Sequence, residues 1–294
     1  MTAGTNFEPA TATSSRRLKG LALVVGSAIA FALATVVVKV LSRFDTPAPT
    51  IAAGRFWIGA VGLSIWFLLR TGRLPWPRRP ELVLGRAATN LVAVLLFYAA
   101  IARATITNAN ILNLTYPIFI ALLAPLLLRE RTSRRQLVAV AVGVAGVWTL
   151  IAPDFGGAGS VGDLIALACG FVSAFAVILL RAARQHDDAD TIVWFVMVAG
   201  AAVLTPQLRW LGIAAPHQVG LWVLAGILGV AGQLLITTGY RHVSALDGSI
   251  ASTSRMLFAV LFGAWLLDEP LGVHIFFGAG AVALSIWLIQ GERP

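Results

Sequence analysis

The sequence is poor in cysteine and in charged residues. Its single cysteine, Cys169, lies inside an apolar run, so the chain cannot form an intramolecular disulfide, and a cysteine-based metal site is not expected. Charged residues make up 12% of the 294 residues, whereas soluble domains carry about 25%. These deficits exclude a disulfide scaffold, a disordered chain and a soluble cytosolic enzyme.

Titratable groups are also missing from the middle of the apolar runs. The 13 acidic residues and the 4 histidines all fall in loops or near the ends of predicted helices. A proton-coupled carrier normally places a carboxylate or a histidine along its pathway. We therefore expect downhill transport or exchange, and no metal or organic cofactor.

Apolar residues are abundant, at 58% of the chain with a mean hydropathy of +0.85. A helix needs about 20 apolar residues to cross a bilayer. We expect an all-α membrane protein with ten transmembrane helices embedded in the lipid bilayer. The predicted spans are 20–41, 49–69, 82–101, 105–128, 136–152, 161–180, 190–206, 217–239, 246–267 and 272–289.

The basic residues lie mainly in the connections between these runs. Loops on one predicted side carry 15 Lys and Arg, and loops on the other side carry 3. Because cytoplasmic loops collect basic residues, both termini are predicted to be cytoplasmic, with residues 1–17 as a cytoplasmic tail. The expected location is the cell inner (plasma) membrane. The same rule accounts for the net charge of +9 without nucleic-acid binding.

The two halves of the chain resemble each other. At an offset of 139, Leu122, Leu127, Leu128 and Glu130 recur as Leu261, Leu266, Leu267 and Glu269. Each half, 18–152 and 160–290, holds five predicted spans, so the second must enter the membrane from the opposite side. Such two inverted five-helix repeats are common in secondary transporters, whose substrate sites lie near the midplane between the halves.

Several short motifs suggest a family. They are Tyr98-Ala99-Ala100-Ile101, Tyr116-Pro117 and Leu128-Arg129-Glu130, echoed by Tyr240 and Leu267-Asp268-Glu269. With them the chain resembles ten-helix EamA-type members of the drug/metabolite transporter superfamily. The resemblance implies a transporter that exports small metabolites, with amino acids a frequent substrate and drug or sugar-derivative exporters as related branches. The family often has a proline in the ninth span matching Pro117. Here Arg255-Met256 stands in its place, so a symmetric pair of hinged helices is not predicted.

Arg255 is the most informative candidate residue. It lies about nine residues into the ninth span, close to mid-membrane at 1.5 Å per residue. One interpretation is a bidentate contact with the carboxylate of an amino-acid substrate. The alternative is a structural role, in which it binds backbone carbonyls or snorkels toward the membrane surface. Arg86, five residues into its span, is interpreted as an interfacial anchor.

Other polar residues share faces of the predicted helices. Amides in lipid would be unsatisfied, so these must face water or other helices, either as a cavity wall or as interhelical hydrogen bonds. Pro117 is a candidate hinge. Deep aromatic residues such as Trp57 either pack in the core, which is the more common outcome, or form a cavity that suits large apolar side chains. The second interpretation favours aromatic or other large neutral amino acids as substrates. The remaining substrate-binding candidates are Tyr98, Asn110, Asn113, Tyr116, Gln233, Tyr240 and Ser252.

Two other classes of protein compete with a transporter. An intramembrane enzyme would need a base near a serine such as Ser160 or Ser249, and no histidine lies at mid-depth. A channel would favour rings of charge or filter carbonyls. We therefore expect no enzyme activity, a small-molecule substrate, and a monomer or weak dimer that works by alternating access.

Overall fold

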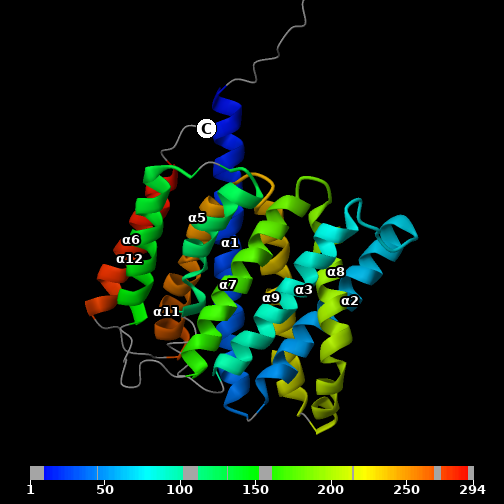
Figure 1. Ribbon diagram of the computed structural model, residues 1–294. Helices are drawn as coiled ribbons and strands as arrows, with labels where there is room; N and C mark the ends of the chain where they lie inside the picture. The colour runs from blue at the N-terminus through cyan, green and yellow to red at the C-terminus, as the bar shows by residue number, and fades with distance from the viewer. Residues whose placement is uncertain are drawn as a thin grey trace, which may run out of the picture.

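The computed structural model consists of helices and their connections throughout its described part (Figure 1). The description covers residues 10–44, 46–101, 112–130, 132–151, 161–213, 215–267 and 273–290. The first-half helices are α1 (Ala10–Ser42), α2 (Ala48–Thr71), α3 (Pro80–Ile101), α5 (Tyr116–Leu127) and α6 (Arg134–Ile151). The second-half helices are α7 (Val161–Ala183), α8 (Ala189–Leu204), the 3-10 helix η1 (Thr205–Ile213), α9 (Pro216–Gly239), α10 (Ala245–Ser252), α11 (Ser254–Leu267) and α12 (Val273–Gln290).

Local sequence signals set several helix ends. The α2 helix ends at Gly72, whose φ of 69° is left-handed and whose N–H donates to the carbonyl of Leu68. A capping box opens α6, where Ser133 Oγ accepts from Gln136 N at 3.1 Å and Gln136 Oε1 accepts from Ser133 N at 2.9 Å. The Ser244 hydroxyl caps α10 by accepting from Asp247 N at 3.0 Å.

The helices have the length and surface of a membrane protein. Among the described residues, seven helical stretches are long and apolar enough to cross a bilayer, and α5 and residues Ile275–Ile289 of α12 are shorter apolar helices. Large apolar side chains face outward, among them Leu69, Leu126 and Trp265, each more than three-quarters exposed. A surface this apolar requires a lipid environment. The expected fold class, an all-helical membrane protein, is confirmed.

Helix pairing shows that the chain is built from two related halves. The α1 helix packs along α9, and α7 packs along α3, which are the corresponding pairs when the halves are exchanged. The α6 helix packs on α12 and α2 packs on α8, each pair joining equivalent helices. In Figure 1, α1 begins at the end of the bundle where α7 finishes, so these equivalent helices run in opposite directions.

Two equivalent helices are interrupted at the same point. A turn at Leu114 and Thr115 precedes α5, and Thr253 separates α10 from α11. The offset of 139 found in the sequence places Leu114 opposite Thr253. The second break therefore exists although no proline marks it. Residues at such breaks carry the substrate sites of many transporters, because freed backbone groups there line a cavity.

Candidate functional site

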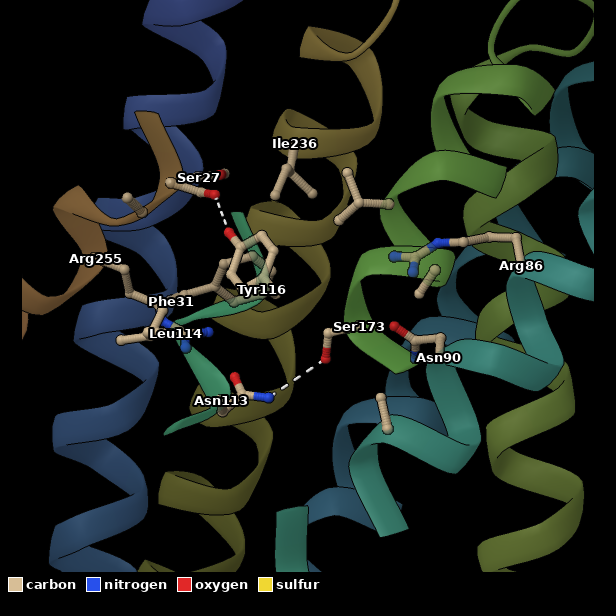
Figure 2. A pocket seen from close by; sticks show the side chains of 15 residues that line it. Ser27, Phe31, Arg86, Asn90, Asn113, Leu114, Tyr116, Ser173, Ile236 and Arg255 are labelled. Carbon is tan, nitrogen blue, oxygen red and sulfur yellow. Dashed lines mark hydrogen bonds between the residues drawn. The ribbon is translucent and has the colours of Figure 1, made fainter. Parts of the chain in front are cut away.

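A cavity of about 150 Å³ lies between the two halves of the molecule (Figure 2). Its 15 lining residues come from α1, α3, α5, α7, α9, α10 and α11 and from the turn before α5. Both helix breaks reach this cavity. The cavity therefore lies at the interface between the halves, where inverted-repeat transporters bind their substrates.

Arg255 lines the cavity from the first turn of α11. Within the described part of the chain, its guanidinium makes no hydrogen bond or ion pair with another residue. None of the 15 lining residues is acidic. The cavity thus presents a cation without a matching carboxylate from the protein.

The cavity wall is built from equivalent positions of the repeat. Asn113 and Tyr116 in the first half correspond to Ser252 and Arg255 in the second at the offset of 139, and all four line the cavity. The Tyr116 hydroxyl forms a short hydrogen bond with the Ser252 hydroxyl. It also donates to the Ser249 carbonyl at 3.3 Å. The two interrupted helices therefore touch across the interface between the halves.

Asn113 is held on the other side by α7. Its amide Nδ2 donates to Cys169 Sγ at 2.9 Å and to Ser173 Oγ at 3.3 Å, and the latter bond is drawn in Figure 2. Gly170 of α7 permits this approach, because a Cβ there would lie 2.9 Å from the Leu112 carbonyl oxygen. These contacts fix the amide of Asn113 at the cavity wall. They leave its Oδ1 without a protein donor in the described residues.

Arg86 is the main difference from the sequence-based interpretation. It was expected to be an anchor at the membrane surface, but the structure places it in the cavity wall with only 6% of the residue exposed. Its Nε is buried without a hydrogen-bond partner in the described part of the molecule. The reason is packing: α3 lies against α7 on this face, so Arg86 points inward rather than to the surface.

Two predicted residues lie outside the lining. Gln233 is buried, and its Oε1 accepts from Arg55 Nη2 at 2.9 Å. The Arg55 guanidinium also lies over the ring of Phe31, which itself lines the cavity, at 5.1 Å from the ring centroid. Tyr240 is fully buried against Gly248, where a Cβ would meet its ring at 2.5 Å. Neither side chain lines the cavity.

The remaining predictions are only partly covered by the structure. Asn110 and the side chain of Tyr98 lie outside the described residues. Pro117 stands in the first turn of α5, directly after the break, so its hinge role stays a prediction. Trp57 does not line the cavity and packs with the cluster around Phe56.

Sequence reasoning missed several lining residues. Ser27 of α1 and Ser173 of α7 are isolated hydroxyls in apolar helices, and Asn90 of α3 lies one turn after Arg86. The spacing of Arg86 and Asn90, four residues apart, was a usable signal because it puts both on one helix face. The hydroxyls carried no comparable signal.

The end of the bundle where α1 begins and α12 ends, hereafter the terminal end, is closed by ionic contacts. Arg17 pairs with Asp247 at 2.7 Å, and Gln136 Nε2 donates to the other oxygen of that carboxylate at 2.8 Å. Arg181 pairs with Glu130 at 2.9 Å. Glu130 Oε2 also accepts from the backbone N–H of Ala245 at 2.9 Å. These bonds tie α1, α5, α6, α7 and α10 together above the cavity.

Arg184 completes the terminal end. Its Nε donates to the Thr237 carbonyl at 2.9 Å and its Nη1 donates to the Asp187 carbonyl. Burial is the main cause that lowers the pKa of this guanidinium, and the positive charge of Arg241 acts in the same direction. The side chain is therefore a structural brace between α7 and α9.

Comparisons with known proteins agree with this arrangement. Residues 18–152 and 160–291 each match the EamA-like transporter family. The chain is 26% identical over 250 residues to the pseudopaline exporter CntI of Pseudomonas aeruginosa, covering 84% of this chain and 86% of the exporter. It is 28% identical over 296 residues to a riboflavin transporter of Rhizobium johnstonii, covering 95% and 93%.

A solved crystal structure shares the fold. It matches with a TM-score of 0.72 at 18% identity over 93% of this chain and 97% of the other. A duplicated family domain, a cavity between the two copies and this shared fold point to one conclusion. The chain belongs to the EamA-like transporter family and is a multi-pass membrane transporter of small molecules, not an enzyme.

Proposed function

We propose that the protein exports small carboxylate-bearing metabolites, with amino acids as the first class to test. Transport proceeds by alternating access around the cavity, downhill or by exchange, in a cell inner (plasma) membrane with both termini cytoplasmic. The observation that carries the proposal is Arg255, a cation in the cavity wall at the break between α10 and α11. A guanidinium binds a carboxylate through two parallel hydrogen bonds.

The polar surroundings of Arg255 support an amino-acid-like ligand. The Asn113 amide oxygen and the hydroxyls of Ser173 and Ser252 lie in the same wall and can accept hydrogen bonds from an ammonium group. The lack of an acid in the lining supports a carrier without a carboxylate proton relay.

The size of the cavity bears on the substrate. Pockets for drug-sized ligands measure about 300–1,000 Å³, and a cavity of about 150 Å³ accepts a molecule close to benzene in size. This favours a small amino acid over the aromatic or large neutral ones suggested by the sequence. It also disfavours, in this conformation, a drug, a sugar derivative or a molecule as large as riboflavin.

Counterflow in proteoliposomes tests the proposal. Vesicles loaded with one unlabelled amino acid at a time, from aliphatic, polar, acidic and aromatic types, should take up the labelled counterpart saturably. An Arg255→Gln variant should lower the apparent affinity about 10- to 100-fold, as expected for a lost charge-assisted pair. Arg70→Gln removes the same charge from an exposed arginine of α2 and is the matched control. Absence of exchange with every amino acid would refute the amino-acid proposal.

A further inference from the structure

The cavity contains a second cation that a simple amino-acid site does not require. Arg255 enters from α11 and Arg86 from α3, and Figure 2 shows them on opposite sides with Asn113, Tyr116 and Ser173 between them. The inference below rests on the proposed function, in which this cavity is the substrate site. The second guanidinium then restricts the kind of ligand that the cavity can bind.

Arg86 differs in its surroundings from three other arginines that contact neighbouring helices. Arg55, Arg181 and Arg184 all have hydrogen-bond acceptors from the protein, whereas none is found for Arg86 among the described residues. At 6% exposed, it is also not hydrated as a surface residue would be. Charges inside a membrane protein pair with one another or face a water-filled pathway. A guanidinium left without an acceptor in a cavity wall is positioned for an anion from outside.

The fold itself does not demand this arginine. The Tyr98 and Tyr240 motifs align the third and eighth spans at an offset of 142, which places Leu228 and Gly232 of α9 opposite Arg86 and Asn90 of α3. At these two positions the second half has residues without polar side chains. Arg86 and Asn90 are therefore specific to the first half. The repeated fold forms at the equivalent positions without such polar side chains, so helix packing does not explain them.

We infer that the cavity binds a small molecule with two anionic groups, one at Arg255 and the other at Arg86. The polar groups of Asn90, Asn113 and Ser173 solvate the part between them. Two buried cations in one cavity repel each other and are costly without counter-charge. A ligand with two carboxylates neutralises both, whereas a ligand with one leaves a buried cation unpaired.

Four probes of similar size separate the relevant groups. Succinate and aspartate carry two carboxylates, and propionate and alanine carry one; aspartate and alanine also carry an amino group. We expect succinate or aspartate to exchange in proteoliposomes with an apparent affinity at least about tenfold higher than that of its one-carboxylate counterpart. The comparison of succinate with aspartate reports whether the amino group is recognised.

Substitutions assign the second carboxylate to Arg86. Arg86→Gln should reduce the affinity for the preferred dicarboxylate to the level of its one-carboxylate counterpart while changing the latter less than about twofold. Arg86→Lys should keep much of the preference because the charge remains. Arg255→Gln should weaken all carboxylates, and Arg70→Gln should weaken none. If Arg86→Gln misfolds, so that size-exclusion chromatography shows no single peak, Arg86→Met replaces it in the same test. Methionine removes the charge but keeps a long apolar side chain that fills the space of the arginine stem.

A binding measurement on purified protein keeps the inference independent of transport rate. At equal ionic strength, succinate or aspartate should raise the thermal unfolding midpoint in detergent by several degrees, and propionate or alanine should raise it less. Equal exchange and equal stabilisation by one- and two-carboxylate probes, unchanged in Arg86→Gln, would overturn the inference and leave the proposed function intact. Failure of all four probes to exchange or to bind would overturn the inference, and the proposed function fails with it only if no amino acid of the counterflow series exchanges.

Discussion

Arginines at the terminal end and arginines in the cavity differ in their partners. At the terminal end, Arg17 meets Asp247 at 2.7 Å and Arg181 meets Glu130 at 2.9 Å. In the cavity, Arg86 and Arg255 have no acidic partner within the described part of the chain. At the terminal end, basic side chains are therefore neutralised by carboxylates of the protein. The cavity keeps its cations available for a ligand.

The difference distinguishes structural from functional charge in this fold. A structural arginine arrives with an acceptor from another helix, so the cost of burying it is offset within the protein. A substrate-binding arginine has that cost offset only when the ligand is present. Intramembrane charge alone is a weak criterion for function, and charge without a protein partner is a stronger one. Adding a protein partner to a cavity arginine, or removing one from an arginine at the terminal end, therefore tests this distinction.

The largest effect is expected when a cavity arginine receives a partner from the protein. Asn90→Asp places a carboxylate four residues after Arg86 on the same face of α3, close enough to form an internal ion pair. The pair should compete with the bound anion by about 3 kcal/mol, which corresponds to a loss of affinity of about 100-fold. Counterflow with labelled aspartate or succinate measures it.

Asn90→Ser is the matched control for this substitution. It removes the amide but adds no charge, so its effect should stay below about tenfold. If Asn90→Asp binds anions as well as the parent protein does, Arg86 does not contact the substrate. The proposal that the unpaired cavity arginines bind the ligand would then be wrong for Arg86.

The reverse experiment removes a partner from the terminal end. Asp247→Asn removes the ion pair of Arg17, whose hydrogen bond to the Ile289 carbonyl at 2.7 Å remains. Breaking a fully buried pair costs about 3–5 kcal/mol, and we expect about 2 kcal/mol here because Arg17 is partly exposed and keeps that second acceptor. The thermal unfolding midpoint in detergent should fall by several degrees. Asp188→Asn, at an exposed carboxylate, should leave it unchanged; an equal fall in both variants would contradict the prediction.

Several residues of the cavity could be predicted from the sequence alone. Arg255 was predicted as a site residue because it lies about nine residues into its predicted span, close to mid-membrane. Asn113 and Ser252 were predicted from helix-face spacing and Tyr116 from its motif and the polar residues around it, and all three line the cavity. The architecture followed from the repeat at an offset of 139. These features are local or periodic, so one sequence contains them.

Arg86 and the second helix break were not predicted, for physical reasons. The distance of Arg86 from its helix end suggests an anchor, and only the packing of α3 on α7 turns it inward. The break at Thr253 has no proline and follows from a run of small polar residues whose hydroxyls bond to backbone carbonyls. Thr253 Oγ1, for example, donates to the Ile250 carbonyl at 2.7 Å. Such bonds compete with the helix but become decisive only in the tertiary context.

Helix packing outside both regions gives a smaller effect. A Cβ on Gly146 of α6 would lie 2.9 Å from Val282 N and 3.0 Å from the Gly278 carbonyl oxygen, both backbone atoms of α12. Gly146→Ala must therefore separate α6 from α12, at a cost of about 1–2 kcal/mol. Gly280→Ala on α12 meets nothing within 4 Å and is the control. A fall in the unfolding midpoint for Gly146→Ala but not for Gly280→Ala would show that the close contact matters.

The smallest effect is expected at His242, in the turn between α9 and α10 at the terminal end. Burial lowers the pKa of its imidazole below the usual 6.5, and the positive charges of Lys19 and Arg241 lower it further. The folded state then keeps His242 neutral at a pH where the unfolded chain already binds a proton. Its contribution to stability is complete above about pH 6.5 and is lost as the pH falls toward the folded-state pKa.

Unfolding midpoints measured from pH 7.5 to 5.5 isolate this contribution by difference. The parent protein should lose stability on acidification more steeply than a His242→Gln variant, by a small margin because the imidazole is partly exposed to solvent, which screens its charge. The charges around His242 explain the sign, because protonation would add a cation beside Lys19 and Arg241. An equal slope in both proteins would mean that the imidazole does not sense them. His242 would then play no part in the electrostatics of the terminal end, whereas the ion pairs of Arg17 and Arg181 would remain.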